Sequence, residues 1–163
     1  MVFQMDKQLK AVMKTVSKWL HINVSDTVLE SLVQFIKFGI VGVSNTLISY
    51  ILNILVLLAL SSFHVHWDYV AGNLVAFFLS VLWSFYWNNK YVFTLEEGKT
   101  RSIGKALLKT YISYSITGIF LTNILSYVWI DMLNISKYIA PLINLIISVP
   151  LNFIINKFWA FKS

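Results

Sequence analysis

The sequence has no cysteine among its 163 residues, and only 12% of its residues are charged. Without thiols the chain can form neither a disulfide framework nor a thiolate metal site. Its start, MVFQMDKQLK, lacks the short apolar core and small-residue cleavage site of a cleaved signal peptide. We therefore expect the chain to enter a membrane, if it does so, through segments that it keeps.

Apolar residues are abundant instead. They make up 58% of the chain, and the mean hydropathy of +0.71 lies well above that of soluble proteins. Four segments reach the roughly 20 residues that a transmembrane helix needs, and none of them contains an acidic residue: 38–60, 69–89, 111–130 and 138–157. These features predict an integral membrane protein.

The basic residues predict how the spans are oriented. Of the 13 lysines and arginines, all but Lys137 fall before the first span, between the second and third, or from the last residue of the fourth onward. Because cytoplasmic loops carry the excess of positive charge, both termini and the middle loop are expected in the cytoplasm. The chain is thus predicted to cross the membrane several times.

Residues 1–32 form a separate leader ahead of the membrane domain, which we assign to 33–163. Val2, Leu9 and Val16 follow helical spacing, while Lys10 and Lys14 take the opposite face. This pattern predicts an amphipathic helix in the membrane interface, with its lysines among anionic head groups. A partly disordered basic leader is the alternative. Ser25 or Asp26 is the candidate cap of the helix that follows.

The second and fourth spans end in similar sequences. Ser84–Phe93 reads SFYWNNKYVF, and Asn152–Phe161, 68 residues later, reads NFIINKFWAF. At this offset the identical pairs are Leu74 and Leu142, Ser80 and Ser148, Val81 and Val149, Phe85 and Phe153, Asn88 and Asn156, and Phe93 and Phe161. Both spans run from outside to inside, so the halves are expected to be parallel repeats. The predicted fold is an all-α membrane protein, with four transmembrane helices as two parallel helical-hairpin repeats and an N-terminal amphipathic interfacial helix.

The order of these motifs resembles the GtrA-like membrane proteins. The first span opens QFIKFGIVGVSNTLISY (Gln34–Tyr50), and the ends of the second and fourth spans follow the pattern Asn, basic, x, aromatic, x, Phe. The resemblance covers about Val33 to Phe161. It departs at Asn89, where the family usually has Arg or Lys, whereas Lys157 fits. Lys90 is the candidate for the missing charge, although it points about 100° away around the helix.

The resemblance implies a transport function. Members of the family are thought to flip a polyprenyl-phosphate sugar across the bacterial plasma membrane, in glycosylation of cell-surface polysaccharide or teichoic acid. The expected partners are therefore membrane lipid, an undecaprenyl-phosphate type of sugar carrier and membrane glycosyltransferases. Since four helices can hardly enclose a sugar-sized channel, we expect an open groove or a homo-oligomer.

Polar stripes on three spans are the candidate path for the sugar. They recur at about four-residue spacing, which places each stripe on one helix face: Asn45, Ser49 and Asn53; Asn73, Ser80, Ser84 and Asn88; and Asn144, Ser148, Asn152 and Asn156. Amides donate and accept hydrogen bonds, so they can replace water around sugar hydroxyls without a fixed charge. The alternative is that these side chains only join helices.

Basic residues near the inner surface are candidates for attracting the phosphate. Together with Asn89, the residues at the two span ends are Lys90 and Lys157, and the middle loop adds Arg101, Lys105 and Lys109. Lysines beside spans also set topology, which is the simpler interpretation of these residues.

The sequence gives little support for an enzyme. The seven carboxylates lie outside the spans, and no acid and base pair emerges from them. His64 and His66 lack an evident third metal ligand, so neither a metal nor another cofactor is expected. The remaining alternative is a non-transporting accessory subunit that assembles or stabilises a membrane glycosyltransferase.

Overall fold

The computed structural model describes residues 2–19, 21–61, 68–95, 98–136 and 139–162. His64, His66 and Lys137 lie outside these residues. The helices and π-helical turns are α1 (Val2–Trp19), α2 (Asp26–Leu60), α3 (Asp68–Trp87), η2 (Asn88–Val92), α4 (Ile103–Ser115), η3 (Ile116–Leu121), α5 (Thr122–Tyr127), η4 (Val128–Met132), α6 (Ala140–Ile155) and η5 (Asn156–Ala160). The prediction of an all-helical membrane protein is confirmed.

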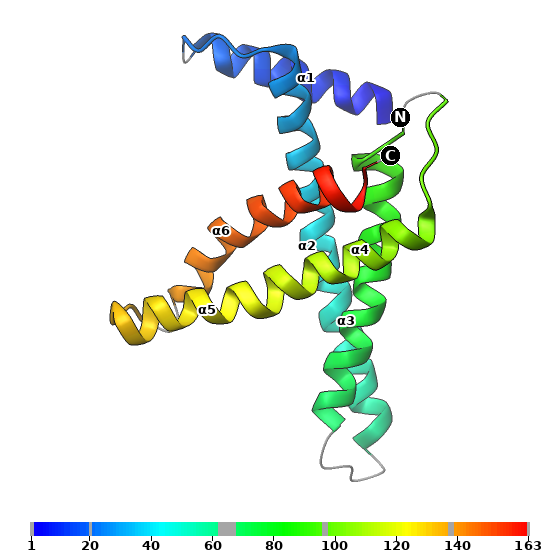
Figure 1. The fold of residues 1–163 in the computed structure, drawn as a ribbon, viewed down its shortest axis with the longest axis vertical. Coiled ribbons are helices and arrows are strands. Elements are labelled where there is room, and N and C mark those ends of the chain that lie inside the picture. The colour runs from blue at the N-terminus through cyan, green and yellow to red at the C-terminus, as the bar shows by residue number, and fades with distance from the viewer. Residues whose placement is uncertain (1, 20, 62–67, 96–97, 137–138, 163) are drawn as a thin grey trace.

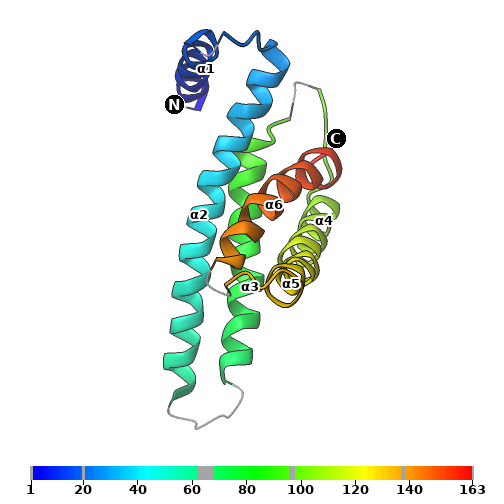
Figure 2. The same cartoon turned by 90° about the vertical axis from the view of Figure 1, so that its left-hand side faces the viewer.

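The helices form two hairpins that cross. The first consists of α2 and α3, which pack along each other (Figure 1). The second runs without a break from α4 to η4 and returns as α6 and η5. Two perpendicular views show this second hairpin lying across the first instead of beside it (Figures 1 and 2).

Three helical segments of the described residues are long and apolar enough to span a membrane: Asp26–Leu60, Ile103–Met132 and Ile143–Ala160. The predicted second span corresponds to α3, which has 20 residues. Helix α2 starts well before residue 38, because Ser25 caps it by accepting a hydrogen bond from the backbone N–H of Val28 at 3.4 Å. It runs on through the predicted boundary at residues 32 and 33.

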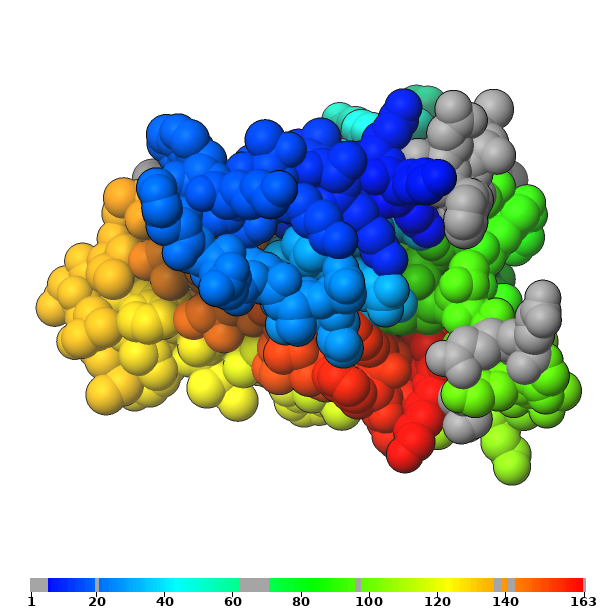
Figure 3. Space-filling view, turned by 90° about the horizontal axis from the view of Figure 1, so that it is seen from above, coloured from blue at the N-terminus to red at the C-terminus, as the bar shows by residue number. Residues whose placement is uncertain are grey.

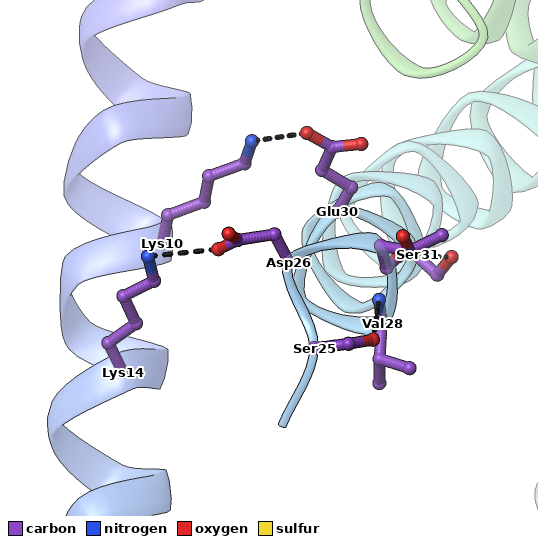
Figure 4. Close-up of polar contacts among 8 residues, drawn as sticks. Lys10, Lys14, Ser25, Asp26, Val28, Glu30 and Ser31 are labelled. Carbon is purple, nitrogen blue, oxygen red and sulfur yellow. Dashed lines mark hydrogen bonds and ion pairs between the residues drawn. The ribbon is translucent and has the colours of Figure 1, made fainter. Parts of the chain in front are cut away.

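Helix α1 is held to the start of α2 by ion pairs. Lys10 Nζ lies 2.8 Å from Glu30 Oε1, and Lys14 Nζ lies 2.9 Å from Asp26 Oδ1 (Figure 4). These two lysines therefore turn toward α2, whereas the sequence predicted them among lipid head groups. On the opposite side of α1, Val12, Val16 and Trp19 are exposed, which leaves an apolar strip uncovered.

The hydrophobic core lies where the hairpins meet, and it is built from the repeat. Its eight buried residues form four pairs, each separated by 68 positions: Phe38 and Ala106, Phe85 and Phe153, Val92 and Ala160, and Phe93 and Phe161. The core is thus made of the same positions in both halves. The two hairpins therefore pack against each other through residues at corresponding positions of the repeat.

The ring contacts in this core obey a pseudo-twofold relation. The centroids of Phe85 and Phe161 are 5.5 Å apart, and those of the corresponding pair, Phe153 and Phe93, are 5.8 Å apart. Phe93 and Phe161 stack on each other at 4.7 Å, so this pair lies on the pseudo-axis. Such reciprocal contacts are the mark of an isologous interface.

Each repeat also ends in the same backbone feature. The N–H of Phe93 donates to the carbonyl of Asn88, and the N–H of Phe161 to that of Asn156, both at 2.8 Å. These bonds span five residues and close the π-helical turns η2 and η5. Single π-helical turns occur often at functional sites. The shared turn fixes where the two asparagines and the phenylalanines that follow them point.

Candidate functional site

A buried polar cluster joins α3 to α4 beside the aromatic core. Ser84 and Asn88 are fully buried. The hydroxyl groups of Ser84 and Tyr114 lie 2.6 Å apart, and Asn88 Nδ2 donates to Ser84 Oγ at 3.1 Å. These predicted groove residues therefore connect the two hairpins.

The second repeat carries the matching cluster within its own hairpin. Asn156, also fully buried, donates from Nδ2 to Ser113 Oγ at 3.1 Å and to Asn152 Oδ1 at 2.8 Å. Ser113 in turn donates to Asn152 Oδ1 at 2.8 Å. The amide oxygens of Asn88 and Asn156 have no hydrogen-bond partner among the described residues. Both clusters thus keep one free acceptor.

The other predicted residues of α6 lie further from the core. Asn144 is 2% exposed and bonds to α5 and η4, because its Nδ2 donates to Ser126 Oγ at 2.7 Å and its Oδ1 accepts from Trp129 Nε1 at 3.1 Å. Ser148 is half-buried. Asn144 therefore joins the helices of the second hairpin to each other.

A polar groove of about 560 Å³ opens between the first hairpin and η3. It collects the predicted stripe of α2, the outer part of the stripe of α3 and residues from the start of the second hairpin: Asn45, Thr46, Ser49, Tyr50, Asn53, Asn73, Ala76, Phe77, Ser80, Val81, Tyr114, Gly118 and Ile119. Its volume falls in the range of about 300–1,000 Å³ that is typical of small-molecule sites. Asn45 and Asn73 are thus brought together in one cavity.

A second cavity, of about 410 Å³, lies at the end of the molecule where both repeats finish. It is lined by Gln34, Phe93, Thr94, Leu95, Lys99, Arg101, Lys157, Phe158, Phe161 and Lys162. Four of these residues are cationic, and no acidic residue of the described chain lines it. In Figure 3, which views this end, the red C-terminal segment lies against the green segment that follows α3. We call this cavity the cationic pocket.

Arg101 supplies the positive charge next to Asn89. Its Nη1 donates to Asn89 Oδ1 at 2.7 Å and its Nη2 to the carbonyl of Phe93 at 3.0 Å, and the guanidinium lies 5.1 Å from the ring centroid of Phe161. Burial lowers the pKa of this guanidinium, which still stays charged at neutral pH. Lys90, the residue expected to take this place, is exposed and donates to Tyr86 Oη at 3.1 Å instead.

The remaining basic residues separate into two groups. Lys157 belongs to the cationic pocket and donates to Ser31 Oγ at 2.7 Å. Lys109 donates to the carbonyl of Trp159 at 3.1 Å, and Lys105 is exposed on α4. Neither Lys105 nor Lys109 lines the cationic pocket. Within the described residues, no ion pair includes Arg101 or Lys157.

Sequence reasoning did not identify several residues of these sites. Tyr114 lines the groove, and Gln34, Lys99 and Lys162 line the cationic pocket. The two lysines carried a signal, since they are basic and near the predicted inner surface. Tyr114 and Gln34 carried none, because their roles depend on how the hairpins cross.

A comparison with known protein families identifies the family of this chain. The model of the GtrA/DPMS transmembrane domain matches residues 37–161. The chain belongs to this family. The resemblance noted from the motifs is thereby confirmed, and the GtrA/DPMS match makes the chain a multi-pass membrane protein related to flippases of lipid-linked sugars. No curated protein and no solved structure matches the chain significantly.

Proposed function

We propose that this GtrA/DPMS protein moves a polyprenyl-phosphate-linked sugar, of the undecaprenyl-phosphate type, across the bacterial plasma membrane. The sugar would then serve glycosylation of cell-surface polysaccharide or teichoic acid. In this proposal the protein is a transporter that catalyses no chemical step, and both of its termini lie in the cytoplasm. The observation that carries the proposal is the cationic pocket at the meeting point of the two repeats.

The cationic pocket has the chemistry of a phosphate site. Arg101 and Lys157 are both partly buried, and neither is neutralised by an ion pair among the described residues. A cation that is partly removed from water gains most from a phosphate, which accepts charge-assisted hydrogen bonds from the planar guanidinium. Phe158, next to Lys157, is exposed and apolar, as a residue beside an isoprenoid chain would be.

The polar groove offers the next part of the path. Its amides and hydroxyls can replace the water around a sugar, and an open groove leaves the isoprenoid tail in the lipid throughout. The two repeats would then resemble the halves of transporters whose sites lie at a repeat interface.

A non-transporting accessory subunit is the second candidate. The placement of the asparagines of α6 and η5 favours it, because Asn144, Asn152 and Asn156 are used in contacts between helices. In that case the chain would assemble or stabilise a membrane glycosyltransferase, alone or as a homo-oligomer, and the groove would not carry cargo.

Translocation in liposomes tests the proposal. The purified protein would be reconstituted with a fluorescent short-chain isoprenyl phosphate glucoside, and the fraction that reaches the other leaflet measured over time. Arg101→Gln and Lys157→Gln should each lower the rate by at least about tenfold, the effect of losing one charged hydrogen-bond donor.

Lys105→Gln is the matched control, since it removes an exposed charge of α4 outside the pocket. Its rate should stay within about twofold of the wild type. If the wild type moves no lipid, while a glycosyltransferase loses activity without it, the transport proposal fails and the accessory function replaces it.

A further inference from the structure

The polar groove differs from the cationic pocket in the kind of ligand that it fits. Its lining consists of amides, hydroxyls, aromatic rings and small or apolar side chains, with no charged residue among them. Tyr50 and Phe77 supply aromatic surface, while Asn45, Ser49 and Asn53 supply donors and acceptors. Mixed apolar walls with a few polar groups are typical of sites for small uncharged ligands.

The amides of the groove have hydrogen-bonding capacity left for a ligand. Asn45 Oδ1 is buried and has no partner among the described residues. Asn53 Nδ2 donates to Asn73 Oδ1 at 2.9 Å. That bond uses only one of the two N–H donors of Asn53 and one acceptor site of Asn73. A sugar, whose hydroxyls both donate and accept, complements such a set.

Glycine at position 72 makes room for this pair. A Cβ atom there would lie 3.0 Å from Asn53 Nδ2, tighter than nine in ten Cβ contacts, so the amide of Asn53 would have to shift. The second hairpin has no such pair, because the residues 68 positions after Asn53 and Asn73 are Leu121 and Pro141. This amide pair is therefore a specialised feature of the first hairpin, whereas the aromatic core is shared by both hairpins.

The groove and the cationic pocket lie too far apart for one sugar phosphate to occupy both. Gln34 lines the pocket and Asn45 is the first α2 residue of the groove. At 1.5 Å per residue these two positions of α2 are separated by about 16 Å along the helix. This distance is about half of a 30 Å hydrocarbon core. The two sites would be visited in succession, the second at mid-membrane depth.

We infer that the groove binds the glycosyl part of the cargo and accepts sugars without charge, such as hexoses, while rejecting uronic acids and sugars with a free amino group. This inference rests on the proposed function and specifies its substrate class. The phosphate charge is common to all such cargoes. A second charge on the sugar would enter a low-dielectric site that contains no opposite charge, and that costs several kcal/mol.

Binding measurements on the full chain in lipid nanodiscs test this selectivity. The probes are a short-chain isoprenyl phosphate without sugar, its glucoside and its glucuronide. The glucoside should bind at least about tenfold more tightly than the glucuronide. The glucoside should also bind more tightly than the isoprenyl phosphate without sugar. Equal affinity for the glucoside and the glucuronide would overturn the inference.

Substitutions in the groove should remove only the contribution of the sugar. Asn45→Leu and Asn53→Leu should bring the affinity for the glucoside down to that of the sugar-free probe, whose own affinity stays unchanged. Asn123→Leu, which replaces an exposed amide outside the groove, is the control. Ser49→Val is a smaller change in the same lining and should also weaken binding of the glucoside only. With this third variant, the test does not depend on one protein that fails to fold.

The failure of this inference can be told apart from failure of the proposed function. If the sugar-free probe binds and Arg101→Gln weakens it, but the groove variants bind the glucoside as the wild type does, only the inference is wrong. If the sugar-free probe does not bind, or Arg101→Gln leaves its affinity unchanged, the phosphate site itself is wrong.

Discussion

Replacing Phe161 with alanine should lower the free energy of unfolding by about 3 kcal/mol, the lower end of the range for a buried Phe→Ala change. The ring stacks on Phe93 at 4.7 Å and on Phe85 at 5.5 Å, and the Arg101 guanidinium lies 5.1 Å from its centroid. Removing the ring leaves a cavity on the pseudo-axis, where side chains of both hairpins pack against the ring. The value is at the low end because unfolded helices in detergent or lipid keep an apolar environment.

Thermal unfolding of the purified protein in detergent measures this effect, and Phe158→Ala is the matched control. Phe158 lies in η5, the turn that Phe161 follows, but is 66% exposed, so its truncation should cost less than about 0.5 kcal/mol. Phe93→Ala should lower the free energy of unfolding by as much as Phe161→Ala does. The double variant should lose less than the sum of the two single losses, because both substitutions remove the same contact. Equal effects of Phe161→Ala and Phe158→Ala would contradict the proposed core.

Asn156→Asp should prevent stable folding, with a loss of more than about 4 kcal/mol. Asn156 is fully buried, and its Nδ2 donates to the carbonyl and to the Oδ1 of Asn152, both at 2.8 Å. Aspartate has the same shape but, when ionised, no donor. It would bring a buried negative charge against two acceptors, which loses these bonds and adds repulsion.

The yield of monodisperse protein and its unfolding midpoint measure this loss. Asn23→Asp, the same exchange at an exposed position between α1 and α2, should leave both within the error of the wild type. The yield and unfolding midpoint of Asn156→Ala should lie between those of Asn23→Asp and Asn156→Asp, since this change removes the donor without adding a charge. A stable Asn156→Asp protein would show that this amide is not enclosed as described.

The repeat was the part of the fold that the sequence predicted best. Identity at Phe85 and Phe153 and at Phe93 and Phe161 marked the residues that became the core, because side chains that hold two similar halves together are constrained in the same way in each half. The crossing of the hairpins was not predictable, since it is set by the shape of contacts between residues far apart in the chain. The placement of Tyr114 followed from that crossing.

The sites were only partly predictable for a related reason. The residue types were informative: amides along α2 indicated the groove, and basic residues near Phe161 indicated the cationic pocket. The sequence did not show which of these residues come together in one site. Helical periodicity predicts which residues share a helix face, but it does not predict which other helix packs against that face. Lys90 and Arg101 illustrate this, since the nearer residue in sequence turned outward and the one 12 positions from Asn89 bonded to it.

The pseudo-twofold core implies how such a chain arose. Contacts in which Phe85 meets Phe161 and Phe153 meets Phe93 are those that two identical hairpins would make with each other. The two hairpins accordingly have the arrangement expected of an internal duplication, in which a hairpin and its copy pair as two identical subunits of a dimer would. The two halves now differ at their ends, because Lys157 in one corresponds to Asn89 in the other, and Asn89 accepts a hydrogen bond from Arg101. The two equivalent ends of a symmetric pair have thus become chemically different parts of one chain.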